Sequence, residues 1–179
     1  KFLSTLGRSG SSDKAKASEM VHATRRHIKI NVDYDPARYK TFDKRLNEIM
    51  KRYQDNWEQL LVQLSLLRED MKDGERQTLN GLDENGQVFY DIMADLVFTD
   101  DVPEDKQTLL VDLVNEVYRL IVDAINIPHF WEMKFSEQRN LKGDITKALI
   151  ISDIDEFDDK EVQITEDLMK LAKKRHHYI

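Results

Sequence analysis

The sequence of 179 residues contains no cysteine. This absence excludes disulfides, thiolate metal sites and cysteine nucleophiles, and it favours an intracellular, cytoplasmic protein. The chain also lacks a signal-peptide pattern, and no apolar run approaches the roughly eighteen residues that a membrane span needs. No segment shows the alternation of apolar and polar residues that is typical of a half-buried strand. We therefore expect no membrane segment, and we predict an all-α fold.

Charged residues are abundant but unevenly distributed. They make up 34% of the chain, against 40% apolar residues, and the net charge is −7. Residues 1–54 carry 13 Lys and Arg against 6 Asp and Glu, residues 55–168 carry 10 against 28, and residues 169–179 carry 4 against none. The basic ends and the acidic middle can neutralise each other or present different faces to two partners. The acidic middle argues against nucleic acid coating the whole surface, but it leaves a local basic groove open.

The strongest pattern is an apolar stripe at helical spacing across residues 35–73. Asp35 can cap a helix, and Pro36 suits the first helical position, where a missing N–H costs nothing. Apolar residues then recur at three- and four-residue steps, as Tyr39, Phe42, Leu46, Ile49, Met50, Tyr53, Trp57, Leu60, Leu61, Leu64, Leu67 and Met71. We predict one long amphipathic helix on which everything else packs. The alternatives are two helices in register and a kink near Asp55, where Glu58 completes a possible capping-box pattern.

Two rows of basic residues border the first half of this stripe. At 100° per residue, one row consists of Arg38, Arg45 and Arg52, and the other of Lys40, Lys44 and Lys51. One interpretation is a ladder of positive charge for an anionic partner. The other is that the aliphatic stems of these side chains cover the edges of the core while their charges reach water.

The remaining pattern predicts an irregular bundle of about six helices around the long one. Residues 1–12 are expected to be a linker or the end of a preceding element, and residues 13–179 a single helical domain. We expect helices over residues 13–30, 87–97, 103–124 and 136–151, a loop over 73–87, and a terminal basic helix within 158–179. The expected core stripes include Leu109 and Val162.

The motifs of common catalytic and metal sites are incomplete. The spacing of Gly81 and Gly86 is that of a phosphate loop, but Gln87 stands where lysine is required and no strand precedes it. His22 and His27 are five residues apart and face differently, so they do not form a zinc-binding pair. We therefore expect neither catalysis nor a metal in this chain. An alternative of a different class is an enzyme with a metal held by Asp153, Asp155 and Asp158.

Several segments carry a resemblance to a known family. They are Ala23-Thr24-Arg25-Arg26-His27-Ile28, Asp33-Tyr34-Asp35-Pro36-Ala37-Arg38-Tyr39, Leu46 to Ile49 and Asp55-Asn56-Trp57, and more loosely Phe130-Trp131 with Arg139, Leu141, Ile145 and Leu149. Together these segments, which span roughly residues 18–150, resemble the C-terminal helical region of the motor and endonuclease subunit (R subunit) of type I restriction and modification enzymes.

The resemblance implies a function for the longer protein and a different one for this part. The whole subunit is expected to be a type I site-specific deoxyribonuclease that translocates DNA with ATP, with ATP and Mg²⁺ bound in upstream domains. This part is expected to be non-catalytic and to bind no cofactor. The resemblance further implies that this part assembles with the methyltransferase core, which is made of modification and specificity subunits. It also implies that this part contacts double-stranded DNA without reading its sequence. The alternative is a purely protein–protein docking module without DNA contact.

These expectations give candidate site residues. For DNA contact they are Arg25, Arg26, Lys29, Arg38, Lys40, Lys44, Arg45 and Arg52, with Lys173, Lys174 and Arg175 secondary. If about six phosphates are contacted, the log–log salt slope is expected to be about −5. For protein docking we expect Phe130 and Trp131, because aromatic residues beside a break such as Pro128 often anchor an interface. The alternative is that both aromatic side chains fill the end of the bundle.

Overall fold

The structure, a computed structural model, describes residues 13–72, 78–99 and 101–179. Within these residues the chain forms eight α-helices, one 3-10 helix and no strand, so the predicted all-α fold is confirmed. The expected linker at residues 1–12 lies outside the described residues. Contacts divide the chain into two compact units, which we call unit 1 (Lys1–Glu75) and unit 2 (Arg76–Ile179). Each unit is described by itself, and a single domain over residues 13–179 stays a prediction.

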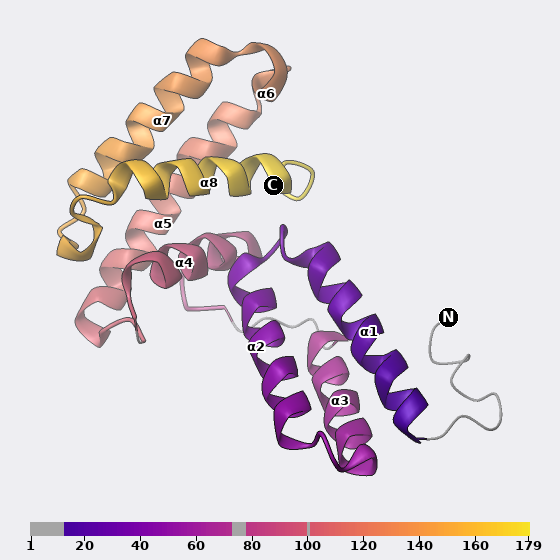
Figure 1. Cartoon of the computed structure of the whole chain (residues 1–179). Coiled ribbons are helices and arrows are strands. Elements are labelled where there is room, and N and C mark those ends of the chain that lie inside the picture. Colours follow the sequence, from indigo (N-terminus) through magenta and orange to yellow (C-terminus); the bar gives the residue numbers. More distant parts are fainter. Residues whose placement is uncertain (1–12, 73–77, 100) are drawn as a thin grey trace. The chain divides into compact units, whose positions relative to one another are not determined.

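The described residues of unit 1 form three helices that pack on one another: α1 (Asp13–Asn31), α2 (Pro36–Arg52) and α3 (Trp57–Lys72). Figure 1 shows α2 running back alongside α1, and α3 returning alongside α2. Each helix contributes an apolar face to one shared core, formed by Ala17, Met20, Val21, Ile28, Phe42, Leu46, Leu60, Leu64, Leu67 and Met71.

The expected single long helix is wrong, because α2 and α3 form a helical hairpin. α2 ends at Arg52, and α3 begins at Trp57. The break is next to the alternative position at Asp55, but the capping residue is Asn56, whose Oδ1 accepts a hydrogen bond from the backbone N–H of Gln59 at 3.1 Å. The apolar stripe keeps its phase across the break because both helices bury the same kind of face in one core.

The predicted start of α2 is confirmed. Asp35 is buried, and its Oδ1 accepts a hydrogen bond from the backbone N–H of Arg38 at 3.2 Å. Pro36 occupies the first helical position, where it has no hydrogen bond to lose. The Asp-Pro pair therefore fixes where the chain turns from α1 into α2.

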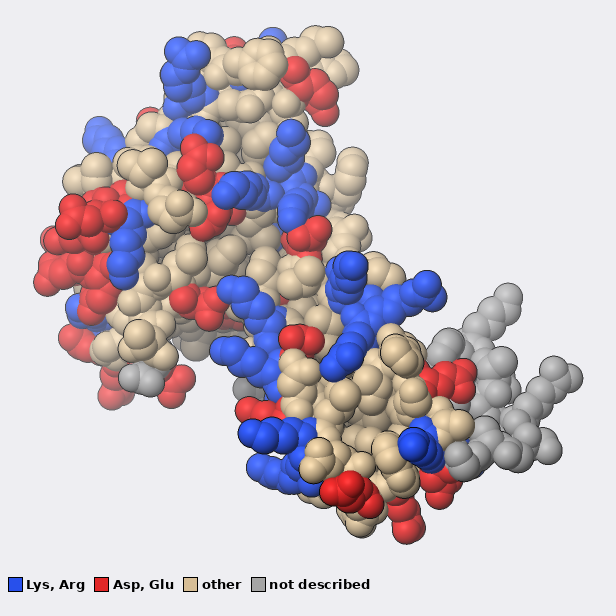
Figure 2. Space-filling model, viewed as in Figure 1, with Lys and Arg blue, Asp and Glu red and all other residues tan. Residues whose placement is uncertain are grey.

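The two units differ in net charge. Unit 1 carries 15 Lys and Arg against 12 Asp and Glu, a net of +3, and unit 2 carries 12 against 22, a net of −10. Figure 2 shows basic side chains over α2 and the end of α1, and acidic side chains gathered around the 3-10 helix of unit 2. The segregation seen along the sequence therefore becomes a difference between two compact units.

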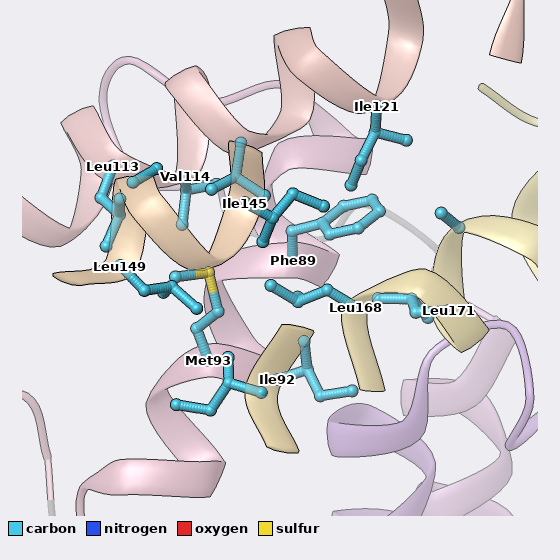
Figure 3. Packing of buried hydrophobic residues seen from close by; sticks show 14 of the residues in the cluster. Phe89, Ile92, Met93, Leu113, Val114, Ile121, Ile145, Leu149, Leu168 and Leu171 are labelled. Carbon is cyan, nitrogen blue, oxygen red and sulfur yellow. The ribbon is translucent and has the colours of Figure 1, made fainter. Parts of the chain in front are cut away.

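Unit 2 is built from α4 (Glu84–Val97), α5 (Glu104–Ile125), α6 (Phe130–Met133), α7 (Phe135–Ile150), the 3-10 helix η1 (Asp155–Phe157) and α8 (Glu161–Arg175). α5 packs on α4 and α7, and α8 packs on α4 and α7. Figure 3 shows that α4, α5, α7 and α8 all send side chains into one core. Its members include Phe89, Met93, Val114, Ile121, Ile145, Leu149, Leu168 and Leu171.

Several predicted boundaries and core positions in unit 2 need correction. α4 begins before residue 87, because Asp83 accepts a hydrogen bond from the backbone N–H of Gly86 at 2.6 Å and so caps an earlier start. Leu109 and Val162 were expected in the core, but they are 42% and 69% exposed. Leu109 lies at the edge of the α5 stripe, and Val162 lies in the first turn of α8. The one-turn helix α6 was not predicted.

Candidate functional site

The arginine row of α2 lies against the core edge on the α3 side. The Nη2 atom of Arg45 is 2.6 Å from Oδ2 of Asp70 on α3, in an ion pair whose side chains are about half exposed. The guanidinium carbons of Arg38 and Arg45 lie 5.5 and 5.9 Å from the ring centre of Phe42. Arg38 and Arg45 therefore pack on apolar surface, and Arg45 also pairs within unit 1, as the second interpretation of the basic rows expects.

The lysine row lies on the side of α2 that adjoins α1. Arg25 of α1 reaches α2, where its Nη2 is 3.5 Å from Oδ1 of Asn47 and 3.4 Å from the sulfur of Met50. The three lysines of the row lie within about 60° of Asn47 around the helix axis, and all three are exposed. Lys29 is exposed one turn beyond Arg25 on α1. We call this set the α1–α2 face: Arg25, Lys29, Lys40, Lys44 and Lys51.

The structure thus brings together some of the predicted DNA-contact residues and separates others. Arg25, Lys29, Lys40 and Lys44 share the α1–α2 face. Arg38, Arg45 and Arg52 lie on the other flank of α2, and Arg26 turns toward α3. Lys51 joins the face although it was not among the candidates, and its seven-residue spacing from Lys44 was the signal.

Among the three basic candidates at the end of α8, Arg175 differs from its neighbours. Lys173 and Lys174 are exposed, whereas Arg175 is only 9% exposed. Its guanidinium donates a hydrogen bond to Oδ1 of Asn85, whose Nδ2 donates to the carbonyl oxygen of Tyr178 at 2.9 Å. Arg175 therefore fastens the C-terminal residues to the first turn of α4, and this structural role competes with contact to a nucleic acid.

The aromatic pair proposed for protein docking lies in or against the core of unit 2. Phe130 is 2% exposed and packs edge-on against Trp131, with ring centres 4.8 Å apart. The carbonyl oxygen of Phe130 accepts a hydrogen bond from Nε2 of Gln138. This placement favours the alternative that both rings fill the end of the bundle. The exposed apolar side chains nearby in sequence are Met133 and Phe135, which pattern reading missed.

A groove of about 720 Å³ lies between α1 and α3 of unit 1. The residues of α1 that line it are Glu19, His22, Ala23, Thr24, Arg26, His27 and Ile30, and those at the end of α3 are Arg68, Met71 and Lys72. Sequence reasoning missed this groove because it combines residues about forty positions apart. The only signal was that α1 alternates basic and apolar residues toward its end.

The geometry does not support the alternative of a metal site. In the described part of the chain, no three His, Asp or Glu side chains are placed to hold a metal ion together. The alternative metal site at Asp153, Asp155 and Asp158 therefore lacks the arrangement that it needs.

Across residues 13–72, 78–99 and 101–179, none of the helices combines the length and the apolar character required to cross a membrane.

Comparison with known proteins gives one clear relationship. No curated protein and no solved structure matches the chain significantly. A family model does match, over residues 9–177, and it describes the C-terminal part of endonuclease subunits like that of the type I restriction enzyme HindI. This match includes all the described helices of both units. The chain therefore belongs to the family of C-terminal domains of HindI-like type I restriction enzyme endonuclease subunits.

Proposed function

We propose that this chain is the non-catalytic C-terminal module of an ATP-dependent, DNA-translocating type I restriction endonuclease subunit. Its role is to assemble the subunit with the methyltransferase core and to contact double-stranded DNA without reading its sequence. The observation that carries the DNA part of this proposal is the α1–α2 face, which gathers exposed cations from two helices on one side of unit 1.

The α1–α2 face has the chemistry that phosphate contact needs. Its lysines extend from Lys40 to Lys51, about 16 Å along α2, a length over which duplex DNA carries roughly ten charges. Ammonium and guanidinium groups on an exposed surface bind phosphate oxygens from many directions, and such contacts position a protein on DNA without specifying a base. The face therefore suits a duplex of any sequence.

A second candidate function is docking to protein alone, and one observation favours it. Arg45, a member of the predicted DNA-contact set, is paired with Asp70 inside unit 1. If acidic side chains neutralise the other Lys and Arg side chains in the same way, their positive charges do not require contact with DNA phosphates. This alternative predicts that DNA binding by the module is absent or insensitive to the charges of the α1–α2 face.

The first prediction separates these two functions by the salt dependence of DNA binding. We expect the triple substitution Lys40→Gln, Lys44→Gln and Lys51→Gln to reduce the log–log salt slope by about 2.7, because each lost phosphate contact removes about 0.9. The measurement is fluorescence anisotropy with a duplex oligonucleotide at several salt concentrations. It uses the endonuclease subunit that contains this chain.

The matched control removes the same charge from unit 2 at Arg139, Lys147 and Lys160, which are exposed outside the candidate set. We expect this variant to keep the slope of the unaltered protein. An unchanged slope in the lysine variant itself refutes the DNA part of the proposal. A parallel pull-down with the methyltransferase subunits tests the assembly part, because deletion of residues 13–179 is expected to abolish it.

A further inference from the structure

The groove between α1 and α3 has an apolar floor and a basic rim. Ala23 and the largely buried Met71 contribute apolar surface inside it, and Ile30, 62% exposed, extends that surface at one end. Arg26, Arg68 and Lys72 supply three positive charges, against the single carboxylate of Glu19. Apolar surface beside basic groups suits a ligand that is itself apolar on one side and acidic at its edges.

The dimensions of the groove match one kind of ligand. Its lining residues on α1 run from Glu19 to Ile30, about 16 Å along the helix axis, which is the length of roughly three helical turns. A helix of that length presents apolar anchors at positions i, i+4 and i+7 to a groove of this kind. The volume of about 720 Å³ accommodates a few such side chains.

We propose that this groove binds an acidic amphipathic helix of a partner protein. Its apolar anchors would lie on Ala23, Ile30 and Met71, and its carboxylates would pair with the exposed Arg26 and Lys72. A duplex fits less well, because phosphates gain nothing from the apolar floor. The identity of the partner as the methyltransferase core rests on the assembly role proposed above, whereas the chemistry of the ligand rests on the groove alone.

The chain offers variants that change the groove without touching the core. Arg26 and Lys72 are exposed, so Arg26→Glu with Lys72→Glu reverses the rim. Ile30→Ser removes exposed apolar surface from the floor. Lys44→Glu with Lys51→Glu makes the same charge change on the α1–α2 face and is the matched control. Far-UV circular dichroism checks that each variant keeps its helices.

The direct test measures binding of a labelled helical peptide about three turns long, with Leu at i, i+4 and i+7 and Glu at most other positions. We expect the unaltered protein to bind it, the rim variant to bind at least about tenfold more weakly, and Ile30→Ser to weaken binding at high and low salt alike. Two controls distinguish binding in the groove from binding by general charge attraction: the control variant, and a peptide with Lys in place of Glu. The control variant should bind the acidic peptide normally, and the Lys peptide should not bind.

The remaining outcomes show whether the inference about the groove fails or the proposed assembly role fails. Failure of the acidic peptide to bind overturns the inference, and so does equal weakening by the rim and control variants. If the rim variant instead lowers only the salt slope of duplex binding, the groove belongs to a nucleic-acid surface and the inference is again wrong. If the peptide binds in the groove but the methyltransferase subunits do not bind the unaltered protein, the inference stands and the assembly role fails.

Discussion

Asp35 shows how a single side chain sets the path between two helices. Its carboxylate is buried and caps α2 through the N–H of Arg38, while Pro36 follows in the first helical position. The sequence predicted this arrangement because capping is a local interaction between residues three positions apart. Local chemistry of this kind is what a sequence records most directly.

The cap at Asp35 gives a prediction about stability. We expect Asp35→Ala to lower the free energy of unfolding by about 1 kcal/mol, because the N–H of Arg38 loses its acceptor. Asp35→Asn keeps an acceptor oxygen and is expected to stay close to the unaltered protein. Urea denaturation followed by circular dichroism measures both. Equal loss in the two variants would show that the charge of Asp35, and not its cap, stabilises the turn.

Two glycines give opposite predictions for the same substitution. An added Cβ at Gly143 meets open space, so Gly143→Ala is expected to raise the free energy of unfolding by about 0.5–1 kcal/mol through helix propensity. Gly81 has φ +98°, which an L side chain rarely adopts, so Gly81→Ala is expected to lower it by about 1–2 kcal/mol. Thermal melts of the two variants check the signs, and a Gly143→Ala protein that melts earlier would contradict the open environment of α7.

The exposure of some side chains could not be predicted from the sequence, because it is set by distant partners. Arg175 reads as the end of a basic tail, yet Asn85, ninety positions away, accepts its hydrogen bond and helps to bury it. Phe130 reads as an interface anchor beside a proline, yet the core of unit 2 closes over it. In both cases the residue type was read correctly, and the missing information was which other segment packs against it.

At the scale of elements, the α2–α3 hairpin shows what periodicity can and cannot specify. The stripe correctly identified the core faces of both helices, including Leu46, Leu60 and Leu64. It did not reveal the reversal of direction, because a stripe in phase fits a straight helix and a hairpin equally well. The turn depends on a short cap at Asn56, a signal much weaker than twelve apolar residues at regular spacing.

The ion pair between α5 and η1 gives a prediction about pH. Nζ of Lys106 donates to both carboxylate oxygens of Glu156, and this hydrogen bond lowers the pKa of Glu156 and raises that of Lys106. A lowered carboxyl pKa contributes stability above the ordinary pKa of glutamate, and that contribution is lost as the pH falls through the lowered value. Replacing Lys106 should therefore matter at neutral pH and cease to matter in acid.

We expect Lys106→Met to lower the melting temperature slightly near neutral pH, because the ion pair is still partly exposed to water, and we expect the difference to close as the pH falls through the lowered pKa of Glu156. Melts across this range measure the effect. Lys147→Met, at an exposed position of α7, serves as the control and should show no such convergence. A difference that persists unchanged in acid would mean that the aliphatic stem of Lys106, and not its charge, stabilises the contact.

At the scale of the whole molecule, the sequence predicted the helical class and the family, but not the organisation into two compact units. The family could be recognised from the sequence because local segments such as Asp33 to Tyr39 are distinctive in themselves. The match over residues 9–177 confirms that resemblance. The groove between α1 and α3 could not be predicted from the sequence, since residues of both helices are needed to form it. The charge asymmetry was visible in the sequence, and its division into units of +3 and −10 required the fold.

The contribution of α8 to the core of unit 2 also has a consequence for synthesis on the ribosome. Among the described residues, the core of unit 1 draws on residues 17–71, so this core can close once α3 has left the exit tunnel. The core of unit 2 needs Leu168 and Leu171, and Arg175 then fastens the chain to α4. The apolar faces of nascent α4 and α5 therefore stay partly uncovered until α8 has been translated.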